Sequence, residues 1–148
     1  MGLDCYIVHG NDHDKAFTSE DSVLLEGISL CGGMLSGSGS DGSFRGKVYE
    51  PLVDELMEDR GGGIWHKCEE YDDPPYVTSD ELKEQAEALE ELIKLKIECM
   101  KEDGETYDYD TIIHTTSCGC EYTYGEVKDL ATLLGVAGKR GAVMHVWW

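Results

Sequence analysis

Residues 78–102, TSDELKEQAEALEELIKLKIECMKE, decide the fold. Their apolar positions recur at spacings of three and four, which is the period of one face of an α-helix. These positions are Leu82, Ala86, Leu89, Ile93, Ile97 and Met100. Thr78 and Glu81 have the spacing of a capping box, in which each side chain accepts a hydrogen bond from the other residue's backbone N–H. The stretch therefore predicts a helix of about six or seven turns.

The outer face of this predicted helix is acidic. Asp80, Glu84, Glu87, Glu90 and Glu91 oppose only Lys83, Lys94 and Lys96 there. Residues 50–110 together carry most of the formal net charge of -19. A solvated helix surface is the ordinary explanation of a charge run. Self-repulsion on this scale costs stability, however, so the excess favours a binding role for the acidic face, with Glu84, Glu87, Glu90 and Glu91 as its expected contact residues.

The charge balance also excludes a class of ligand. The chain has 12 basic and 31 acidic residues. Because phosphate backbones are bound by clustered Lys and Arg, we expect no direct nucleic-acid binding. The expected partner is instead a basic protein, or one whose site normally binds a polyanion.

Length and composition indicate one domain in a cytosol. A chain of 148 residues with 41% hydrophobic content is long enough for one core, and we expect a single domain over residues 1–148. The first residues, MGLDCYIVH, lack the basic region of a signal peptide, and no apolar run is long enough to span a membrane. Without an export signal, the six cysteines are expected to be reduced thiols or metal ligands.

The remaining elements predict an α+β fold. We expect strands over 3–9, 64–68, 107–116 and 142–148, a turn at 118–120, and helices over 48–57 and 124–134. Thr123 and Glu126 give the second helix a capping box, and Gly135 and Gly138 after it are expected to lead into the last strand. Pro51 is expected in the first turn of its helix, and residues 18–31 fit either a helix or a strand. The order lacks a βαβ rhythm, so the prediction is a mixed sheet with about three helices packed on it. A C-terminal strand at the sheet edge could pair across a homo-oligomer.

A Gly/Ser-rich segment is a candidate anion site. Gly37, Gly39 and Gly42 match G-x-G-x-x-G, and Arg45 and Lys47 follow where a helix is expected to begin. Free backbone N–H groups at a helix start, with two cations, could hold the phosphate of a nucleotide. A flexible loop has the same composition. The segment supports an alternative function, a small protein that binds and sequesters an anionic or nucleotide-like ligand.

Two pairs of metal-ligating residues are a candidate zinc site. His66 with Cys68, and Cys118 with Cys120, could together complete a tetrahedral site, and His114 is a further candidate. The spacing differs from the two-residue gap usual in zinc knuckles, and cysteines are often buried without any ligand role. Zinc is thus possible, and no other cofactor is indicated.

No catalytic constellation has a spacing specific enough to name a reaction, so the sequence favours a non-enzymatic role. The serines near residues 36–40 do not form a G-x-S-x-G motif. A nucleotide hydrolase remains an alternative, and it requires carboxylates such as Asp12, Asp14 or Asp41 near the Gly/Ser segment.

Three segments carry a resemblance. The opening MGLD of residues 1–4, SFRGKVY at 43–49, and the closing helix, glycine and His-bearing strand of 124–146 resemble a group of small phage, prophage and bacterial proteins that begin with MGLD. The cysteines and the long acidic helix depart from that pattern. The resemblance implies a phage-type accessory protein that interferes with host machinery or defence, and no established activity accompanies it.

The leading hypothesis combines these observations. We expect a non-enzymatic interaction protein, phage-encoded, whose acidic surface engages a basic, nucleic-acid-binding site on a host protein in the host cytoplasm.

Overall fold

The computed structural model describes residues 4–8, 23–30, 43–60 and 76–147. In chain order their elements are β1 (Asp4–Val8), β2 (Ser43–Phe44), α2 (Gly46–Leu56), the 3-10 helix η1 (Glu58–Arg60), β3 (Tyr76–Val77), α3 (Ser79–Glu102), β4 (Ile112–Thr115), β5 (Glu121–Thr123), α4 (Tyr124–Lys139) and β6 (Val143–Trp147). The fold is α+β, as predicted, with three long helices. The predicted strand over 64–68 lies outside the described residues.

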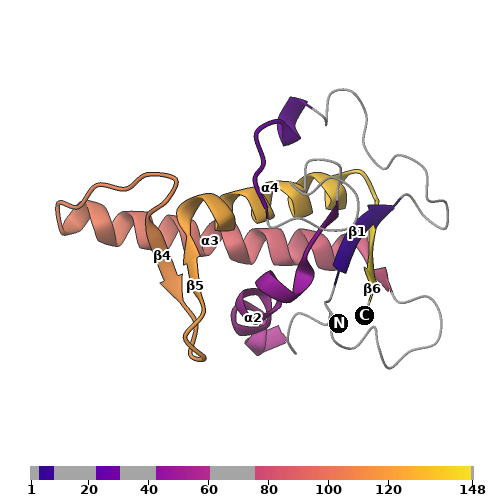
Figure 1. The fold of residues 1–148 in the computed structure, drawn as a ribbon, viewed down its shortest axis with the longest axis horizontal. Helices are drawn as coiled ribbons and strands as arrows, with labels where there is room; N and C mark the ends of the chain where they lie inside the picture. Colours follow the sequence, from indigo (N-terminus) through magenta and orange to yellow (C-terminus); the bar gives the residue numbers. More distant parts are fainter. Residues whose placement is uncertain (1–3, 9–22, 31–42, 61–75, 148) are drawn as a thin grey trace.

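Helices α3 and α4 lie side by side along the longest dimension of the molecule (Figure 1). Both begin with the predicted capping boxes. Thr78 accepts from the Glu81 N–H at 3.3 Å, and Thr123 accepts from the Glu126 N–H at 3.2 Å. The small sheet lies at one end of this helix pair and the β4–β5 hairpin at the other, with α2 alongside α3 between them.

The described sheet has the strand order β2-β1-β6-β3, and each pairing between these strands is antiparallel. Strand β1 pairs with β6 along its whole length, from Asp4 opposite Trp147 to Val8 opposite Val143. The predicted strands at the two ends of the chain are therefore confirmed. Because β6 has β3 on its other side, the expectation that it lies at the edge of the sheet is wrong, whereas a homo-oligomer as such stays a prediction.

The core lies where α3 and α4 meet each other and the sheet. Its largest fully buried residues include Leu82, Leu89, Leu130, Leu133 and Leu134. The predicted apolar stripe of α3 is buried over its first half, whereas Ile93, Ile97 and Met100 are only half-buried. That second half extends past the sheet toward the β4–β5 hairpin, where fewer elements cover it.

Helix α4 is longer than predicted, because two of its glycines pack instead of ending it. The prediction ended at Leu134, and the helix continues through Gly135 and Gly138 to Lys139. A Cβ on Gly138 would lie 2.6 Å from Cγ of Lys83 and 3.0 Å from the carbonyl oxygen of Ser79. Gly138 therefore allows the last turn of α4 to contact the first turns of α3.

Side-chain hydrogen bonding shortens the strand predicted over 107–116 to β4. The carboxylate of Asp108 accepts hydrogen bonds from the Asp110 N–H and the Thr111 hydroxyl, each at 3.0 Å. Such an Asx turn satisfies the backbone locally and competes with strand pairing. Pairing therefore starts only at Ile112.

The helix predicted over 48–57 also differs in its start. Helix α2 begins at Gly46, which places Pro51 in the second turn, so the expectation of a first-turn proline is wrong. Because Pro51 has no backbone N–H, the carbonyl of Lys47, four residues earlier, has no hydrogen-bond donor within the helix. Lys47 is an exposed residue. In the ambiguous segment, residues 23–25 are helical and 28–30 form no strand.

No helix among the described residues combines the length and apolarity that a membrane span requires.

The two helical glycines give a test of the α3–α4 contact. Gly138→Ala is expected to lower the free energy of unfolding by about 1–3 kcal/mol, because the added methyl overpacks the contact with Ser79 and Lys83. Gly135→Ala is the matched control, since its Cβ would meet only Cβ of Ala86 at 3.6 Å. It should be neutral or stabilising by up to about 1 kcal/mol. Urea unfolding followed by circular dichroism measures both, and equal stability of the two variants would contradict the described contact.

Candidate functional site

Six acidic side chains form a straight line on the exposed side of α3, and we call them the acidic ridge. They are Asp80, Glu84, Glu87, Glu91, Glu98 and Glu102. At about 100° per residue they fall within a sector of about 60° that faces away from the buried Leu82 and Leu89. Each of the six is exposed. With a rise of about 1.5 Å per residue, the ridge extends over about 33 Å.

The charge of the acidic ridge is almost uncompensated within the described part of the chain. Its one ion pair there joins Asp80 to Lys83 at 3.8 Å, and the Asp80 side chain is still 91% exposed. An exposed pair at this distance contributes little. Lys83, Lys94 and Lys101 flank the ridge on the side facing α4, and Lys96 lies on the opposite side of α3, beyond Leu92 and Leu95.

The structure separates the four glutamates that the sequence grouped. Glu84, Glu87 and Glu91 lie on the acidic ridge, whereas Glu90 faces α4 and lines a hollow with Lys94 and Lys128. The sequence reasoning missed Glu98 and Glu102. Their spacing of seven and eleven residues from Glu91 could have identified them as members of the same helix face.

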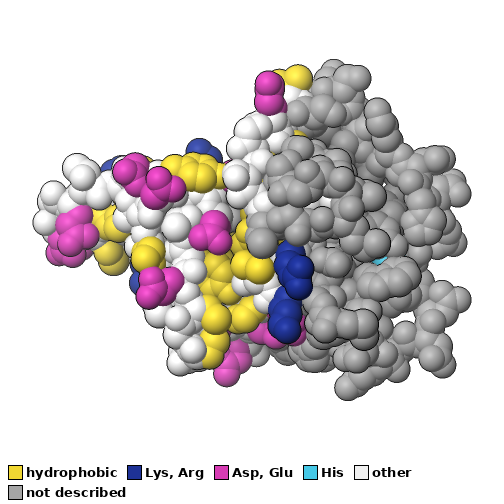
Figure 2. Space-filling view, in the orientation of Figure 1, with side chains coloured by type: hydrophobic (Ala, Val, Ile, Leu, Met, Phe, Trp, Pro, Cys, Tyr) yellow, Lys and Arg dark blue, Asp and Glu magenta, His cyan; other side chains and the backbone are white. Residues whose placement is uncertain are grey.

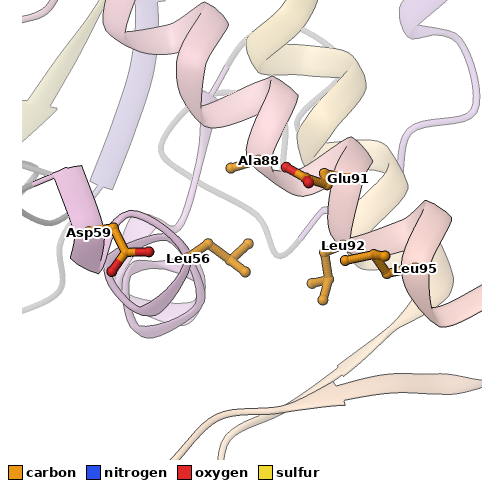
Figure 3. A pocket seen from close by; sticks show the side chains of 6 residues that line it. All are labelled: Leu56, Asp59, Ala88, Glu91, Leu92 and Leu95. Carbon is orange, nitrogen blue, oxygen red and sulfur yellow. The ribbon is translucent and has the colours of Figure 1, made fainter.

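A groove lies beside the acidic ridge, between α2 and α3. Figure 3 shows Leu56 and Asp59 facing the side chains of α3 across an open space of about 250 Å³. The α3 side chains are Ala88, Glu91, Leu92 and Leu95. The groove thus has an apolar floor and a carboxylate from each wall. Figure 2 shows hydrophobic side chains gathered between the β4–β5 hairpin and α2, with acidic side chains around them.

Leu95 belongs to both features. It follows Glu91 by four residues and precedes Glu98 by three, so it occupies the position where the ridge would otherwise carry a carboxylate. Its side chain is 54% exposed although it is a large aliphatic group. The acidic ridge is therefore interrupted by an apolar side chain at the groove.

A second cluster lies at the β4–β5 turn, where Glu55 of α2 holds the hairpin. Its Oε2 is 2.6 Å from Nε2 of His114, and its Oε1 accepts from the Ser117 N–H at 2.8 Å. These two hydrogen bonds, with that of Ser117 the larger cause, hold the pKa of Glu55 below its ordinary value. Sequence reasoning missed Glu55, because 59 residues separate it from His114.

The turn held in this way carries two neighbouring thiols. Sγ of Cys118 is 3.5 Å from Sγ of Cys120, and both cysteines are free. The tight turn predicted for residues 118–120 is confirmed, with Gly119 at φ 92°. Hydrogen bonding from Thr116 first, and then from Cys120, lowers the pKa of Cys118 below that of an ordinary thiol.

The zinc site stays a prediction. The structure brings Cys118 and Cys120 together, while His66 and Cys68 lie outside the described residues. Within the described part of the chain no three His, Cys, Asp or Glu side chains are arranged to hold a metal ion. His114 is hydrogen-bonded to Glu55.

The anion site also stays a prediction. Gly37, Gly39 and Gly42 lie outside the described residues, as do the Asp12, Asp14 and Asp41 that a hydrolase would need. Arg45 is the N-cap residue of α2 and makes no side-chain cap hydrogen bond. Both Arg45 and Lys47 are exposed.

The lowered pKa of Glu55 predicts a pH-dependent stability. The ionised carboxylate is stabilising above its ordinary value of 4.5, and this contribution is lost as the pH falls through the lowered pKa. Glu55→Gln should therefore cost about 1 kcal/mol at neutral pH and less at about pH 3. Urea unfolding at a series of pH values measures the difference. The control is Glu58→Gln at an exposed residue of η1, and a loss for Glu55→Gln that is the same at both pH values would contradict the assignment.

Known proteins do not indicate a role for the acidic ridge or for the cluster at the β4–β5 turn. Comparisons with protein-family models, curated proteins and solved structures found no match to this chain.

Proposed function

We propose that this is a non-enzymatic binding protein whose acidic ridge engages the basic site of a nucleic-acid-binding protein. One observation carries the proposal: six exposed carboxylates follow one face of α3 with a single weak ion pair among the described residues. A surface this acidic repels itself, and a cationic partner removes that cost.

The spacing of the acidic ridge supports a partner that normally binds a polyanion. Successive carboxylates three or four residues apart are separated by roughly 5 Å along the helix axis. A phosphate backbone likewise presents like charges at regular short intervals along a line. Lysines and arginines arranged to follow such a backbone can meet the carboxylates of α3 in the same way.

The groove supports a protein, rather than a simple polycation, as the partner. Leu56, Leu92 and Leu95 offer an apolar surface, with Asp59 and Glu91 at its margin. An apolar or aromatic side chain flanked by basic residues fits both chemistries at once. Buried anchors of this kind supply most of the binding free energy in protein interfaces, whereas exposed charges mainly set rate and specificity.

The proposal places this encounter in the cytoplasm. Among the described cysteines, Cys99, Cys118 and Cys120 are free thiols, as a reducing compartment maintains them. The resemblance to small phage proteins supports a host protein as the partner and an accessory or counter-defence role.

Charge reversal tests the acidic ridge. The variant Glu84→Lys, Glu87→Lys, Glu91→Lys and Glu98→Lys should bind at least about tenfold more weakly to a partner captured from nuclease-treated bacterial lysate. The measurement is the dissociation constant of the purified partner at several salt concentrations, with duplex DNA as competitor. We expect binding of the wild type to weaken with salt and to be competed by the DNA.

The matched control reverses four exposed acidic residues elsewhere, by the changes Glu26→Lys, Glu58→Lys, Glu105→Lys and Glu121→Lys. It alters the net charge by the same amount and should leave affinity within about threefold, since long-range effects are screened. If both variants bind equally weakly, the partner responds to net charge and not to the acidic ridge. If the ridge variant binds as tightly as the wild type, the proposal is refuted.

The variant Leu95→Glu tests whether partner binding needs an apolar contact at Leu95 or only the attraction between charges. It completes the acidic ridge but removes the apolar side chain at the groove. Loss of a buried leucine contact should weaken partner binding by about tenfold or more. The control is Leu24→Glu at another leucine, which is 61% exposed and distant in the chain. Tighter binding of Leu95→Glu would show that charge alone holds the partner.

A further inference from the structure

The two thiols of the β4–β5 turn are close enough to react with each other. A disulfide has an S–S distance of about 2.05 Å, so the 3.5 Å between Sγ of Cys118 and Sγ of Cys120 must close by only about 1.5 Å. Cys118 is exposed and Cys120 half-buried. Between them, Gly119 has a positive φ and no atom within 4 Å of the place where a Cβ would be, so the turn has room to tighten.

The Thr116 hydroxyl lies beside Sγ of Cys118. Its oxygen accepts from the Cys120 N–H at 3.0 Å, and it lies 3.1 Å from Sγ of Cys118 and 3.4 Å from the Cys120 carbonyl oxygen, the two groups that its proton can reach. A thiolate at Cys118 can only accept, so in that state the hydroxyl can donate its proton to the sulfur. A hydrogen bond of this kind stabilises a thiolate, the reactive form of cysteine.

The backbone around these thiols is fixed at several points. The Thr116 N–H donates to the carbonyl of Cys120 at 2.8 Å, and the Gly119 N–H donates to the carbonyl of Thr116 at 2.9 Å. From the opposite side, Glu55 of α2 accepts the Ser117 N–H. These hydrogen bonds fix the backbone of the turn, and the fixed backbone keeps the two sulfurs close together.

We propose that Cys118 and Cys120 form a thiol–disulfide exchange site that reacts with small-molecule disulfides. Cys118 is the attacking thiol because it is the more exposed of the two and has the Thr116 hydroxyl beside its sulfur. This function is separate from partner binding by the acidic ridge.

The reaction balances in two exchange steps. The thiolate of Cys118 attacks one sulfur of a small disulfide, forms a mixed disulfide and releases one small thiolate. The thiolate of Cys120 then attacks Sγ of Cys118, forms the intramolecular disulfide and releases the second small thiolate. The two cysteines are oxidised, the small disulfide is reduced to two thiols, and a dithiol reductant reverses both steps.

The full-length protein treated with oxidised glutathione tests the proposal. Peptide mapping by mass spectrometry should find a Cys118–Cys120 disulfide, seen as the loss of two hydrogen atoms, and dithiothreitol should restore the thiols. Cys99, a free and exposed cysteine on α3, is the internal reference. Oxidation of the pair should be at least about tenfold faster than glutathione addition at Cys99.

Two variants resolve the steps. Cys120→Ser should stop at a stable glutathione adduct on Cys118, because the resolving thiol is absent. Thr116→Val should slow the first step several-fold, with Thr132→Val on the exposed side of α4 as the control. These measurements do not require a binding partner, so their outcome is independent of whether the acidic ridge binds one.

Three results would overturn the proposal. One is a rate for the pair no faster than for Cys99, and another is a Cys120→Ser variant whose Cys118 takes up no glutathione. The third is a pair that is oxidised only after treatment with a zinc chelator, which would assign the two thiols to a metal site instead.

Discussion

The close packing of α4 on α3 is the contact on which the rest of the molecule depends. Gly138 lets the last turn of α4 lie directly on the backbone of Ser79 and the side chain of Lys83. This contact fixes which face of α3 is buried, and so which face carries the acidic ridge outward. Beyond the end of α4 the chain turns at Gly141, which has a positive φ, and enters the sheet as β6 beside β1.

The features that could be predicted from the sequence are those that depend on the spacing of residues close together in the chain. The capping boxes at Thr78 and Thr123, the period of α3 and the α+β class follow from residues three or four apart, and the structure confirms them. Glycine is conformationally free and commonly ends a helix, yet in α4 the lack of a side chain at Gly135 and Gly138 matters for packing. That difference depends on what faces each glycine, which local spacing does not contain.

The candidate sites show the same division. The acidic face of α3 was visible in the sequence, but the separation of Glu90 from Glu91 required the position of α4, and the groove required that of α2. The two thiols were found from their C-x-C spacing alone. The turn that carries these two thiols is held by the hydrogen bond from the Ser117 N–H to Glu55. That bond joins residues about 60 apart in sequence, so no short motif could predict it.

The pairing of β1 with β6 has a consequence for how this chain acquires its structure. Asp4 lies opposite Trp147, so the central strand pair of the described sheet joins residues from opposite ends of the sequence. On a ribosome, β1 emerges long before its partner exists, and closing so long a loop is slow compared with forming the local α3–hairpin–α4 segment. We therefore expect the β1–β6 pair to form last, and until then β1 has only the two residues of β2 as its partner within the described sheet.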